Sequence, residues 1–489
     1  MFEPRAAALW FPPAAQAMYV FSASNGKGGC TLFALLRKGD CPRCHDGKGD
    51  SPRFQTAGNG CSPLFLTALN TYHAMRPQPP GQYARPYWAP KANRWSKTVL
   101  RETGRRLFLA GGGTGGHLYP GLAIAEAILA LEPQAAIAFS CTRRPIDRTV
   151  LAGCGFSVTK IGARPFTKKP WTWPGFILSL ILSGNQARRR LREFCPDVVV
   201  GLGGFGSYAP VRVGQKYGAA TAILNPDIIP GRANRRLGRR ADRVFCQFQE
   251  TAAAFGPCGR ATGCPVRPSL LGATREAGLA EFGLDPARRT LLVTGASLGA
   301  RSVNRAVVAV LKDRGLPQGW QALHLTGHGE YEEVAAAYRV LSVAAAVRPY
   351  TDRMGLAYAA ADLAVARAGA STVAELLAVG LPAIFLPYPY HRDQHQMRQA
   401  RAVEALGAAI VVEDRPGDPG TWRRLAEVLF AVAGDGARLA GLAERARGAG
   451  RPRAAEDIAR QILELADHVT EQRHAGLGAG EKCRVQNAE

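Results

Sequence analysis

Residues 106–120 have the sequence RLFLAGGGTGGHLYP, and this stretch decides the fold class of the chain. Residues 107–110, Leu-Phe-Leu-Ala, form a short apolar run, which is typical of a buried strand. Glycines fill the turn from Gly111 to Gly116, and apolar residues then recur at helical spacing from 122 to 131. A strand, a glycine-rich turn and a helix in this order predict the first unit of a parallel sheet.

Similar units follow and form two series. We expect strands of the first series at 107–110, 136–140, 197–201, 221–224 and 243–246. After a break at the segment GCPVRP (263–268), the second series has expected strands at 290–294, 322–325, 345–348, 363–366 and 383–386, with its own glycine turn, GASLG, at 295–299. The pattern predicts an α/β protein with two Rossmann-like domains that face each other across a cleft, where ligands bind at the carboxyl ends of the strands.

The two ends of the chain differ from this pattern. Residues 1–104 scatter Pro, Gly, Cys and Trp without a helical or strand period, so they predict a largely irregular extension. The alternative is a stretch upstream of the true start, since Met75 is the last methionine before the ordered part. Residues 468–489 are polar and predict a disordered tail.

Composition limits the class of protein. The 489 residues have room for two or three domains, and a net charge of +24 indicates a polyanionic partner: nucleic acid, an anionic membrane or phosphorylated substrates. The eleven cysteines lack the compact spacing of a disulfide framework. Cys41 and Cys44, flanked by Cys30 and Cys61, are a weak candidate for zinc because a second CxxC pair is missing. No apolar run is long enough to span a membrane, so we expect a cytoplasmic protein.

Four motifs suggest chemistry. The first is the turn before His117, where glycine N–H groups and the following helix dipole can hold a phosphate. An imidazole there can act as a general base, or it can simply cap the turn. The second is the 295–299 turn, in which Ser297 and backbone N–H groups could hold a diphosphate, unless it is only an ordinary turn between strand and helix.

The third motif is RAGASTVAE at 367–375. Thr372 and Glu375 have the spacing of a capping box, which would be structural. Alternatively, Glu375 accepts hydrogen bonds from the ribose hydroxyls of a nucleotide. The fourth motif is LPYPYHRDQHQ at 386–396, where Asp393, His395 and Gln396 could bond sugar hydroxyls. A metal site there is disfavoured because nothing defines a coordination geometry.

Taken together and in this order, the motifs resemble one family, the bacterial UDP-N-acetylglucosamine–N-acetylmuramyl-(pentapeptide) pyrophosphoryl-undecaprenol N-acetylglucosamine transferases (MurG), which have the GT-B fold. The resemblance covers residues 105–465. Its signatures are GGTGGHLYPGLAIAEA, GLGGFGSYAP, PGRANR, GASLGARSVN, PYTDRM, RAGASTVAEL and DQHQ. It implies inverting, metal-independent and cofactor-free transfer of N-acetylglucosamine from UDP-GlcNAc to the 4-hydroxyl of lipid I, which gives lipid II for cell-wall synthesis, and through it a role in cell shape and division.

The resemblance also divides the chain and assigns residues. Residues 105–264 would bind lipid I and the membrane, and 265–467 would bind UDP-GlcNAc, with a last helix that can return to the first domain. His117 would be the catalytic base. The implied acceptor-binding residues are Gly112, Gly113, Thr114, Gly115, Gly116, Gly203, Gly204 and Asn234. The implied UDP-GlcNAc-binding residues are Thr114, Gly115, Gly116, His117, Asn234, Arg267, Ser297, Gly299, Tyr350, Met354, Ala370, Ser371, Thr372, Glu375, Asp393 and Gln396.

The chain departs from the family pattern at four places. Where the family usually has His-Glu-Gln-Asn, residues 224–227 are LNPD, which removes an acidic residue from the acceptor side. Leu298, Gln399 and Cys264 replace a usual Gln, Asn and Asn. Two rival hypotheses stay open: a GT-B transferase that acts on another lipid such as diacylglycerol, and a non-catalytic member that binds the lipid precursor, which the first departure favours.

Positive charge concentrates between residues 142 and 240, around the apolar, Trp-rich stretch KKPWTWPGFILSLIL at 168–182. Aromatic residues beside cations favour an interfacial anchor on anionic lipid, formed by Lys168, Lys169, Trp171, Trp173 and Phe176. The alternative is an ordinary core helix with basic flanks. We therefore expect a peripheral protein on the cytoplasmic face of the cell (inner) membrane. Because no nucleic-acid-binding motif accompanies the charge, we expect no nucleic-acid partner.

Overall fold

The computed structural model describes residues 5–8, 18–23, 32–37 and 104–474, except 168, 297, 298 and 416. The chain forms two compact units, residues 1–80 and 81–489. In the first unit, β1 (Arg5–Ala8), β2 (Met18–Ala23) and β3 (Leu32–Arg37) form an antiparallel sheet with β2 in the middle. The sequence did not predict these strands. The predicted disordered tail from residue 468 is wrong over 468–474, which belong to the helix Ala454–His474. The other parts of the predicted extension, its cysteines and residues 475–489 lie outside the described residues.

The second unit contains two parallel sheets. The sheet of the first lobe has seven strands in the order β10-β9-β8-β7-β4-β5-β6, so the chain starts near the middle and winds outward in both directions. Its strands are β4 (Arg106–Ala110), β5 (Ala136–Cys141), β6 (Ser157–Lys160), β7 (Val198–Gly201), β8 (Ala220–Asn225), β9 (Arg243–Cys246) and β10 (Gly259–Ala261). Between β4 and β7 the order reverses, which places the loops after these strands at the switch point where such sheets bind ligands.

The second lobe repeats this architecture with six parallel strands in the order β13-β12-β11-β14-β15-β16. They are β11 (Arg289–Thr294), β12 (Trp320–Leu325), β13 (Ala345–Arg348), β14 (Leu363–Ala366), β15 (Ala383–Phe385) and β16 (Ala409–Val411). The switch point lies between β11 and β14. Ligands are therefore expected near the starts of the helices that follow these two strands.

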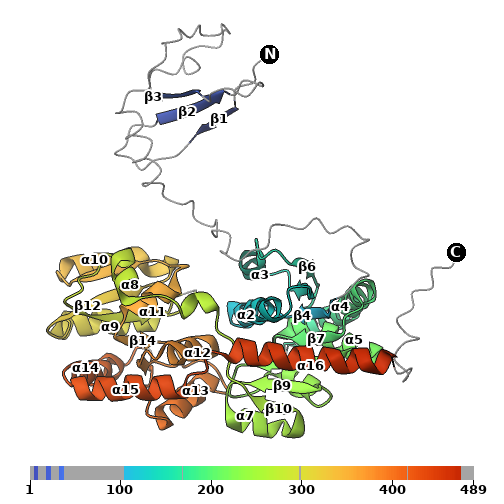
Figure 1. Cartoon of the computed structure of the whole chain (residues 1–489). Helices are drawn as coiled ribbons and strands as arrows, with labels where there is room; N and C mark the ends of the chain where they lie inside the picture. The colour runs from blue at the N-terminus through green and yellow to red at the C-terminus, as the bar shows by residue number, and fades with distance from the viewer. Residues whose placement is uncertain are drawn as a thin grey trace. The chain divides into compact units, whose positions relative to one another are not determined.

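Helices cover both faces of each sheet (Figure 1). In the first lobe they are α2 (Gly115–Leu131), α3 (Pro145–Leu151), α4 (Trp173–Phe194), α5 (Tyr208–Tyr217), α6 (Arg232–Gly238) and α7 (Gln249–Ala254). In the second lobe they are α8 (Arg275–Phe282), α9 (Arg301–Arg314), α10 (Tyr331–Val340), α11 (Met354–Ala360), α12 (Ala370–Val379), α13 (His395–Ala405), α14 (Pro419–Ala433) and α15 (Gly436–Ala449). Because both faces are covered, the central strands are apolar throughout, such as VVVG in β7, rather than alternating.

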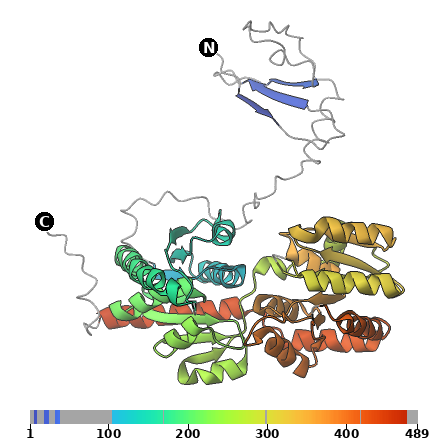
Figure 2. The same cartoon turned by 180° about the vertical axis from the view of Figure 1, so that it is seen from behind.

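The last helix, α16 (Ala454–His474), crosses from the second lobe to the first, as Figures 1 and 2 show from opposite sides. Ile458, Ile462 and Ala466 are fully buried in the core of the first lobe, against α2. Arg105 adds an ion pair with Asp467 of this helix. Residues at the carboxyl end of the chain thus stabilise the lobe formed by its first ordered strands.

The structure confirms the predicted fold class of two Rossmann-like domains. The ten expected strands are present within two residues of their predicted ends. The sequence missed β6, β10 and β16, which are three or four residues long and lie at or next to the sheet edges, where side chains are less buried and the apolar pattern is weak. The helix after β4 also begins at Gly115, within the predicted glycine turn.

Candidate active site between the two lobes

A cavity of about 880 Å³ lies between the lobes, with walls from both. On the first lobe it is lined by the start of α2, and on the second by the linker at Arg267, the 349–354 segment, the start of α12 and the loop before α13. The predicted residues that line it are Thr114, Gly115, Gly116, His117, Arg267, Tyr350, Met354, Ala370, Ser371, Thr372, Glu375 and Gln396. The structure therefore brings together residues from the first, third and fourth sequence motifs.

The glycine turn before α2 is held by one buried carboxylate. Asp147 accepts hydrogen bonds from Gly113 N (2.8 Å) and from Thr142 N (2.9 Å) and hydroxyl. Gly112 and Gly113 have φ values of +123° and +98°, and a Cβ on Gly112 would lie 2.4 Å from an Asp147 oxygen. These two predicted acceptor-binding glycines shape the turn rather than line the cavity.

His117 lies in the first turn of α2 against the backbone of Gly203 and Gly204. A Cβ on Gly203 would lie 2.7 Å from His117 Nδ1, so the two predicted acceptor-binding glycines provide the seat of the imidazole. Nδ1 is buried there without a hydrogen-bond partner of good geometry among the described residues. His117 also lines the cavity between the lobes.

Burial lowers the pKa of His117, while the charges of Asp227 and Asp147 and the Leu202 backbone oppose this shift. The lowered pKa keeps the imidazole neutral near pH 7, the form that can accept a proton. The alternative in which His117 merely caps the turn is wrong: the helix begins at Gly115, and the N-cap Thr114 makes no side-chain cap bond.

The start of α12 faces the cavity with its backbone donors uncapped. Its N-cap is Gly369, and no side chain caps it, so the predicted capping box of Thr372 and Glu375 is wrong. Thr372 lies inside the first turn instead. Gly369, Ala370, Ser371 and Thr372 all line the cavity, and free N–H groups at a helix N-terminus suit a phosphate.

Glu375 lies one turn further along α12 and points to the same cavity. Its Oε2 accepts a hydrogen bond from the Tyr358 hydroxyl at 2.7 Å. Burial raises the pKa of Glu375, and the bond from Tyr358 and the charge of Arg267 oppose the rise. Arg267 stacks on the ring of Tyr119 at 4.3 Å, so this linker arginine touches the first lobe while its charge acts on the second.

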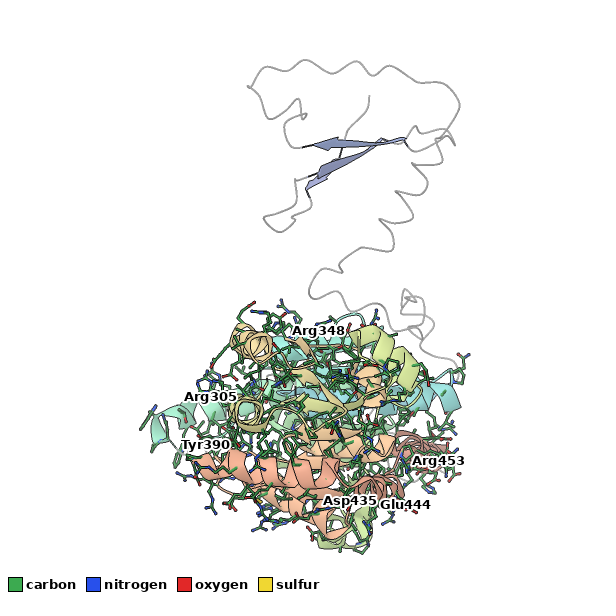
Figure 3. The ribbon with its side chains drawn as sticks, turned by 90° about the vertical axis from the view of Figure 1, so that its left-hand side faces the viewer. Arg305, Arg348, Tyr390, Asp435, Glu444 and Arg453 are labelled. Carbon is green, nitrogen blue, oxygen red and sulfur yellow. The ribbon has the colours of Figure 1, made fainter. Side chains whose placement is uncertain are left out.

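The loop after β15 contributes Gln396, whose Oε1 accepts a hydrogen bond from Tyr388 N. His391 and His395 stack with ring centroids 4.2 Å apart, and both line the cavity. Asp393 bonds His395 Nδ1 at 2.9 Å from outside the cavity lining, and this bond lowers the pKa of Asp393. Tyr390 of the same loop is 66% exposed at the outer surface (Figure 3).

Three other predicted residues occupy different positions. Asn234 is buried behind the cavity and donates to Leu224 O and Asn225 Oδ1. Gly299 lies where a Cβ would be 2.3 Å from the Thr326 carbonyl, so it permits close packing of the turn after β11. Ser297, like the departure Leu298, lies outside the described residues.

Several cavity-lining residues escaped the sequence analysis. They are chiefly Tyr119, Glu126, Asp227 and Tyr358. Burial raises the pKa of Glu126 to about 7, although the charge of Arg267 opposes the shift. Glu126 lies on the helix that carries His117, so the sequence could have indicated it as a site residue. The sequence gave no such indication for Tyr358, because only tertiary contact brings it to Glu375.

Helix α4 forms the predicted membrane segment, and its amphipathicity is inverted. Its buried residues are Ser179, Ser183, Ala187 and Leu191. Its exposed apolar residues, with Trp171 just before the helix, are Trp171 (74% exposed), Trp173 (46%), Ile177 (55%), Leu178 (56%), Leu180 (36%), Ile181 (56%) and Leu182 (49%). The alternative of an ordinary core helix is therefore wrong.

The remaining residues of the predicted anchor are Phe176, Lys169 and Lys168. Phe176 is only half-exposed and packs edge-on against Phe166, with centroids 5.3 Å apart. The Lys169 ammonium lies 5.7 Å from the Trp171 ring, and Lys168 lies outside the described residues. Within the described part of the chain, no helix has the length and hydropathy to cross a membrane, and no cluster of side chains suits a metal ion.

Comparison with known proteins identifies the family. Residues 107–246 match the model of the glycosyltransferase family 28 N-terminal domain, and residues 290–458 match that of the C-terminal domain. The UDP-N-acetylglucosamine--N-acetylmuramyl-(pentapeptide) pyrophosphoryl-undecaprenol N-acetylglucosamine transferase of Thermodesulfovibrio yellowstonii is 37% identical over 313 residues, which cover 63% of this chain and 86% of the relative. The enzyme of the same name from Moorella thermoacetica is 35% identical over 373 residues, 74% of this chain and 99% of the relative. The chain belongs to this transferase family.

Family membership makes the chain a glycosyltransferase and confirms the resemblance inferred from its motifs. Its fold is similar to the crystal structure of MurG from Acinetobacter baumannii, with a TM-score of 0.59 at 24% identity over 74% of this chain and 99% of that one. The matched family models each lie within one lobe, and residues 1–106 precede both of them.

Proposed function

We propose that this transferase moves N-acetylglucosamine from UDP-GlcNAc to the 4-hydroxyl of the N-acetylmuramoyl pentapeptide of lipid I. The observation that carries the proposal is the shared cavity, in which His117 of the first lobe lies opposite the uncapped start of α12 and Glu375 of the second. The relatives named for this reaction are covered along 86–99% of their length. The product would be lipid II, a precursor of the cell wall.

In this mechanism His117 is the general base. Nε2 takes the proton of the acceptor hydroxyl as its oxygen bonds to the anomeric carbon of GlcNAc. The bond from that carbon to the diphosphate breaks, and UDP leaves with the electron pair, so the configuration inverts. The lowered pKa of His117 leaves it neutral and ready to accept the proton.

The second lobe binds the donor. Backbone N–H groups at the start of α12, together with Arg267 and Ser297, hold the diphosphate and stabilise its growing charge as UDP leaves. Glu375 accepts hydrogen bonds from the ribose hydroxyls, Tyr350 and Met354 flank the uracil, and Gln396 contacts the sugar, while Asp393 holds His395 from outside the cavity lining. No metal and no cofactor take part in this proposal.

The exposed apolar face of α4 anchors the first lobe to the cytoplasmic face of the cell membrane. Its seven exposed Trp, Ile and Leu side chains favour insertion at a lipid interface, and Lys169 with Arg188 and Arg189 favours an anionic surface. The cleft would thus lie near the membrane surface, where the polar head of lipid I can enter it.

One experiment tests the proposed reaction. The full chain is incubated with labelled UDP-GlcNAc and lipid I, with a chelator and no added metal, and products are separated as lipids. We expect label in lipid II. Label in a glycolipid made from diacylglycerol, but not in lipid II, would support the rival acceptor. Binding of lipid I without turnover would support a non-catalytic member of the family.

A further inference from the structure

The loop that follows β8 carries a carboxylate that the proposed mechanism has not used. Asp227 lines the cavity from the first lobe and is partly exposed to it. Its carboxylate makes no hydrogen bond or ion pair with any residue in the described part of the chain; only its backbone carbonyl is bonded. An acidic side chain left unpaired in a substrate cleft is available to a charge that appears there during reaction.

The backbone of this loop is fastened from both lobes. Asn225 Nδ2 donates to Asp227 O at 2.7 Å, and Thr251 Oγ1 donates to Ile228 O at 2.7 Å. Ile228 N donates across the lobes to Gln399 Oε1 at 3.2 Å. These bonds fix the loop, so Asp227 is placed by the backbone without needing a side-chain partner.

Two of the chain's departures from the family pattern meet at this loop. Asn225 stands where the family usually has the acidic residue of this segment. It is buried, accepts a hydrogen bond from Asn234 and donates one to the carbonyl of Asp227. The same segment gains Asp227, two residues later and on the cavity wall. Gln399 is the residue whose side chain reaches the loop from the second lobe.

Asp227 acts on His117, which lines the same cavity from α2. Of the two carboxylates that raise the pKa of His117 against the effect of burial, Asp227 has the larger effect and Asp147 the smaller. Asp147 is fully buried and is committed to Gly113 and Thr142, whereas Asp227 is uncommitted. The side chain that can respond to a charge on the imidazole is therefore Asp227.

Other ionisable groups also line the cleft, among them Arg267, Asp352 and His395 of the second lobe. Arg144, at the start of α3, donates to Gly113 O at 2.9 Å and lies on the Phe205 ring. Glu126 lies further along α2, and Glu375 and His391 face the cavity from the second lobe. Burial lowers the pKa of His391, and the charge of Asp227 opposes this shift, as it does for His117.

We propose that Asp227 is a positioning residue for His117: its fixed, unpartnered carboxylate stabilises the imidazolium that forms when Nε2 takes the proton of the acceptor hydroxyl. The proton remains on His117 until the product leaves. The inference rests on the proposed function of this cleft, and it adds a residue for which the sequence motifs gave no role.

The test compares the wild type with Asp227→Asn and Asp227→Glu, using the pH profile of kcat/KM. Removing the negative charge lowers the pKa of His117, so the acidic limb of the profile should move to lower pH by about one unit. The weaker base should lower the plateau about three- to tenfold, with the KM for UDP-GlcNAc unchanged. Asp227→Glu should restore most of the position of the acidic limb and most of the height of the plateau. Glu250→Gln is the matched control, since it removes one exposed charge of the same lobe outside the cavity lining.

A second readout does not need turnover. The ring of His117, assigned by loss of its signal in His117→Gln, is titrated by NMR in the full chain, and its pKa should fall in Asp227→Asn. An unchanged limb and an unchanged titration would overturn the proposal, and so would a change confined to the KM for UDP-GlcNAc. If Asp227→Asn does not fold, Asp227→Ser takes its place. If the wild type transfers no GlcNAc to lipid I, the proposed function fails, while the titration still decides whether Asp227 acts on His117.

Discussion

His117 occupies a seat that only glycine can provide. Gly203 and Gly204 have φ values of +103° and +71°, and any side chain on Gly203 would meet the imidazole. The same close approach removes water from the ring and lowers its pKa. One local feature, a glycine pair after β7, therefore sets both the position and the protonation of the proposed base.

Replacement of His117 by Ala should lower turnover by about 10²–10⁴, the usual contribution of a positioned general base. Affinity for UDP should change little, because the diphosphate and ribose contacts are proposed in the second lobe. Steady-state rates and calorimetric titration with UDP measure the two effects. His468→Ala, on the exposed side of α16, serves as the control. A variant that keeps the wild-type rate would remove His117 from the mechanism.

Glu375→Ala should raise the KM for UDP-GlcNAc more than it lowers kcat, since ribose contacts persist from the ground state to the transition state. Burial raises the pKa of Glu375, so its carboxylate is protonated at a higher pH than an ordinary glutamate. The KM should therefore increase as pH falls in the wild type but not in Glu375→Gln. Initial rates across donor concentrations at several pH values measure this, with Tyr358→Phe showing the effect of losing only the 2.7 Å hydrogen bond. A KM that holds in Glu375→Ala while the melting temperature falls would indicate a structural role.

At the scale of single elements, α4 and β12 each place side chains in surroundings that do not match their polarity. Helix α4 buries Ser179 and Ser183 and exposes Ile177 and Ile181, the reverse of a helix on a water-soluble surface. Strand β12 buries His324 completely among aliphatic neighbours. Both features are costly in isolation, so each needs a compensating interaction: the proposed lipid contact for the first and hydrogen bonds for the second.

Replacing Trp171, Trp173 and Phe176 by Ser should release the protein from anionic vesicles while activity on a short-chain, soluble acceptor persists. Each basic residue near an anionic surface is worth about 1 kcal/mol, so binding should also weaken as salt rises. Because Phe176 packs on Phe166, a second variant with Ile177→Ser and Ile181→Ser changes only exposed positions. Co-sedimentation with vesicles is the measurement, and Val340→Ser, an exposed apolar residue of α10, is the control. Loss of activity on every acceptor with a collapsed melting transition would contradict the anchor.

His324 should make the second lobe sensitive to acid. Its ring bonds the Tyr338 hydroxyl at 3.1 Å and Asn304 Oδ1 at 3.0 Å, and burial lowers its pKa from 6.5 to about 3. Below pH 6.5 the unfolded chain binds a proton that the folded chain refuses. The contribution of His324 to the free energy of unfolding is therefore fully present above pH 6.5. It declines by about 1.4 kcal/mol per pH unit as pH falls toward 3. Urea unfolding between pH 7.5 and 5 should show a steeper loss in the wild type than in His324→Gln; equal slopes would refute the assignment.

At the scale of the whole second unit, α16 connects the lobes. Ile458 and Ile462 are fully buried in the core of the first lobe, although the helix follows α15 of the second. The lobes are also joined across the cleft by Ser371 Oγ, which donates to Gly116 O at 3.4 Å, and by Gln399. The first lobe cannot therefore complete its core until the end of the chain is present.

Ile458→Ala combined with Ile462→Ala should destabilise the first lobe by about 2–5 kcal/mol for each substitution. Hydrogen exchange of β4 and α2 should become faster, while exchange in β11 and β14 stays closer to the wild type. Mass spectrometry of peptides from the four elements measures this. Arg460→Ala, on the exposed side of α16, is the matched control. Equal acceleration in both lobes would show that α16 stabilises the unit without preference.

The sequence alone was sufficient for the repeating units and for the chemistry of their turns. Runs such as VVVG mark strands that are buried on both faces, and the glycines before His117 and the family signatures are local patterns that need no tertiary information. They predicted ten strands, two domains and twelve of the residues that line the cavity. Local patterns carried less information for β6, β10 and β16, because short outer strands lack a buried face on which a pattern can form.

Only the tertiary structure decided which side chains act on one another. Thr372 and Glu375 have capping-box spacing, but the helix begins two residues before Thr372, which frees Glu375 to meet Tyr358 from another element. Gly203 and Gly204, which the resemblance assigns to the acceptor, form the seat of His117. Asp227 carried no motif, yet the loop after β8 places it in the cavity that His117 lines. Burial, protonation and contact between distant segments depend on how the lobes pack, and a linear pattern does not contain that information.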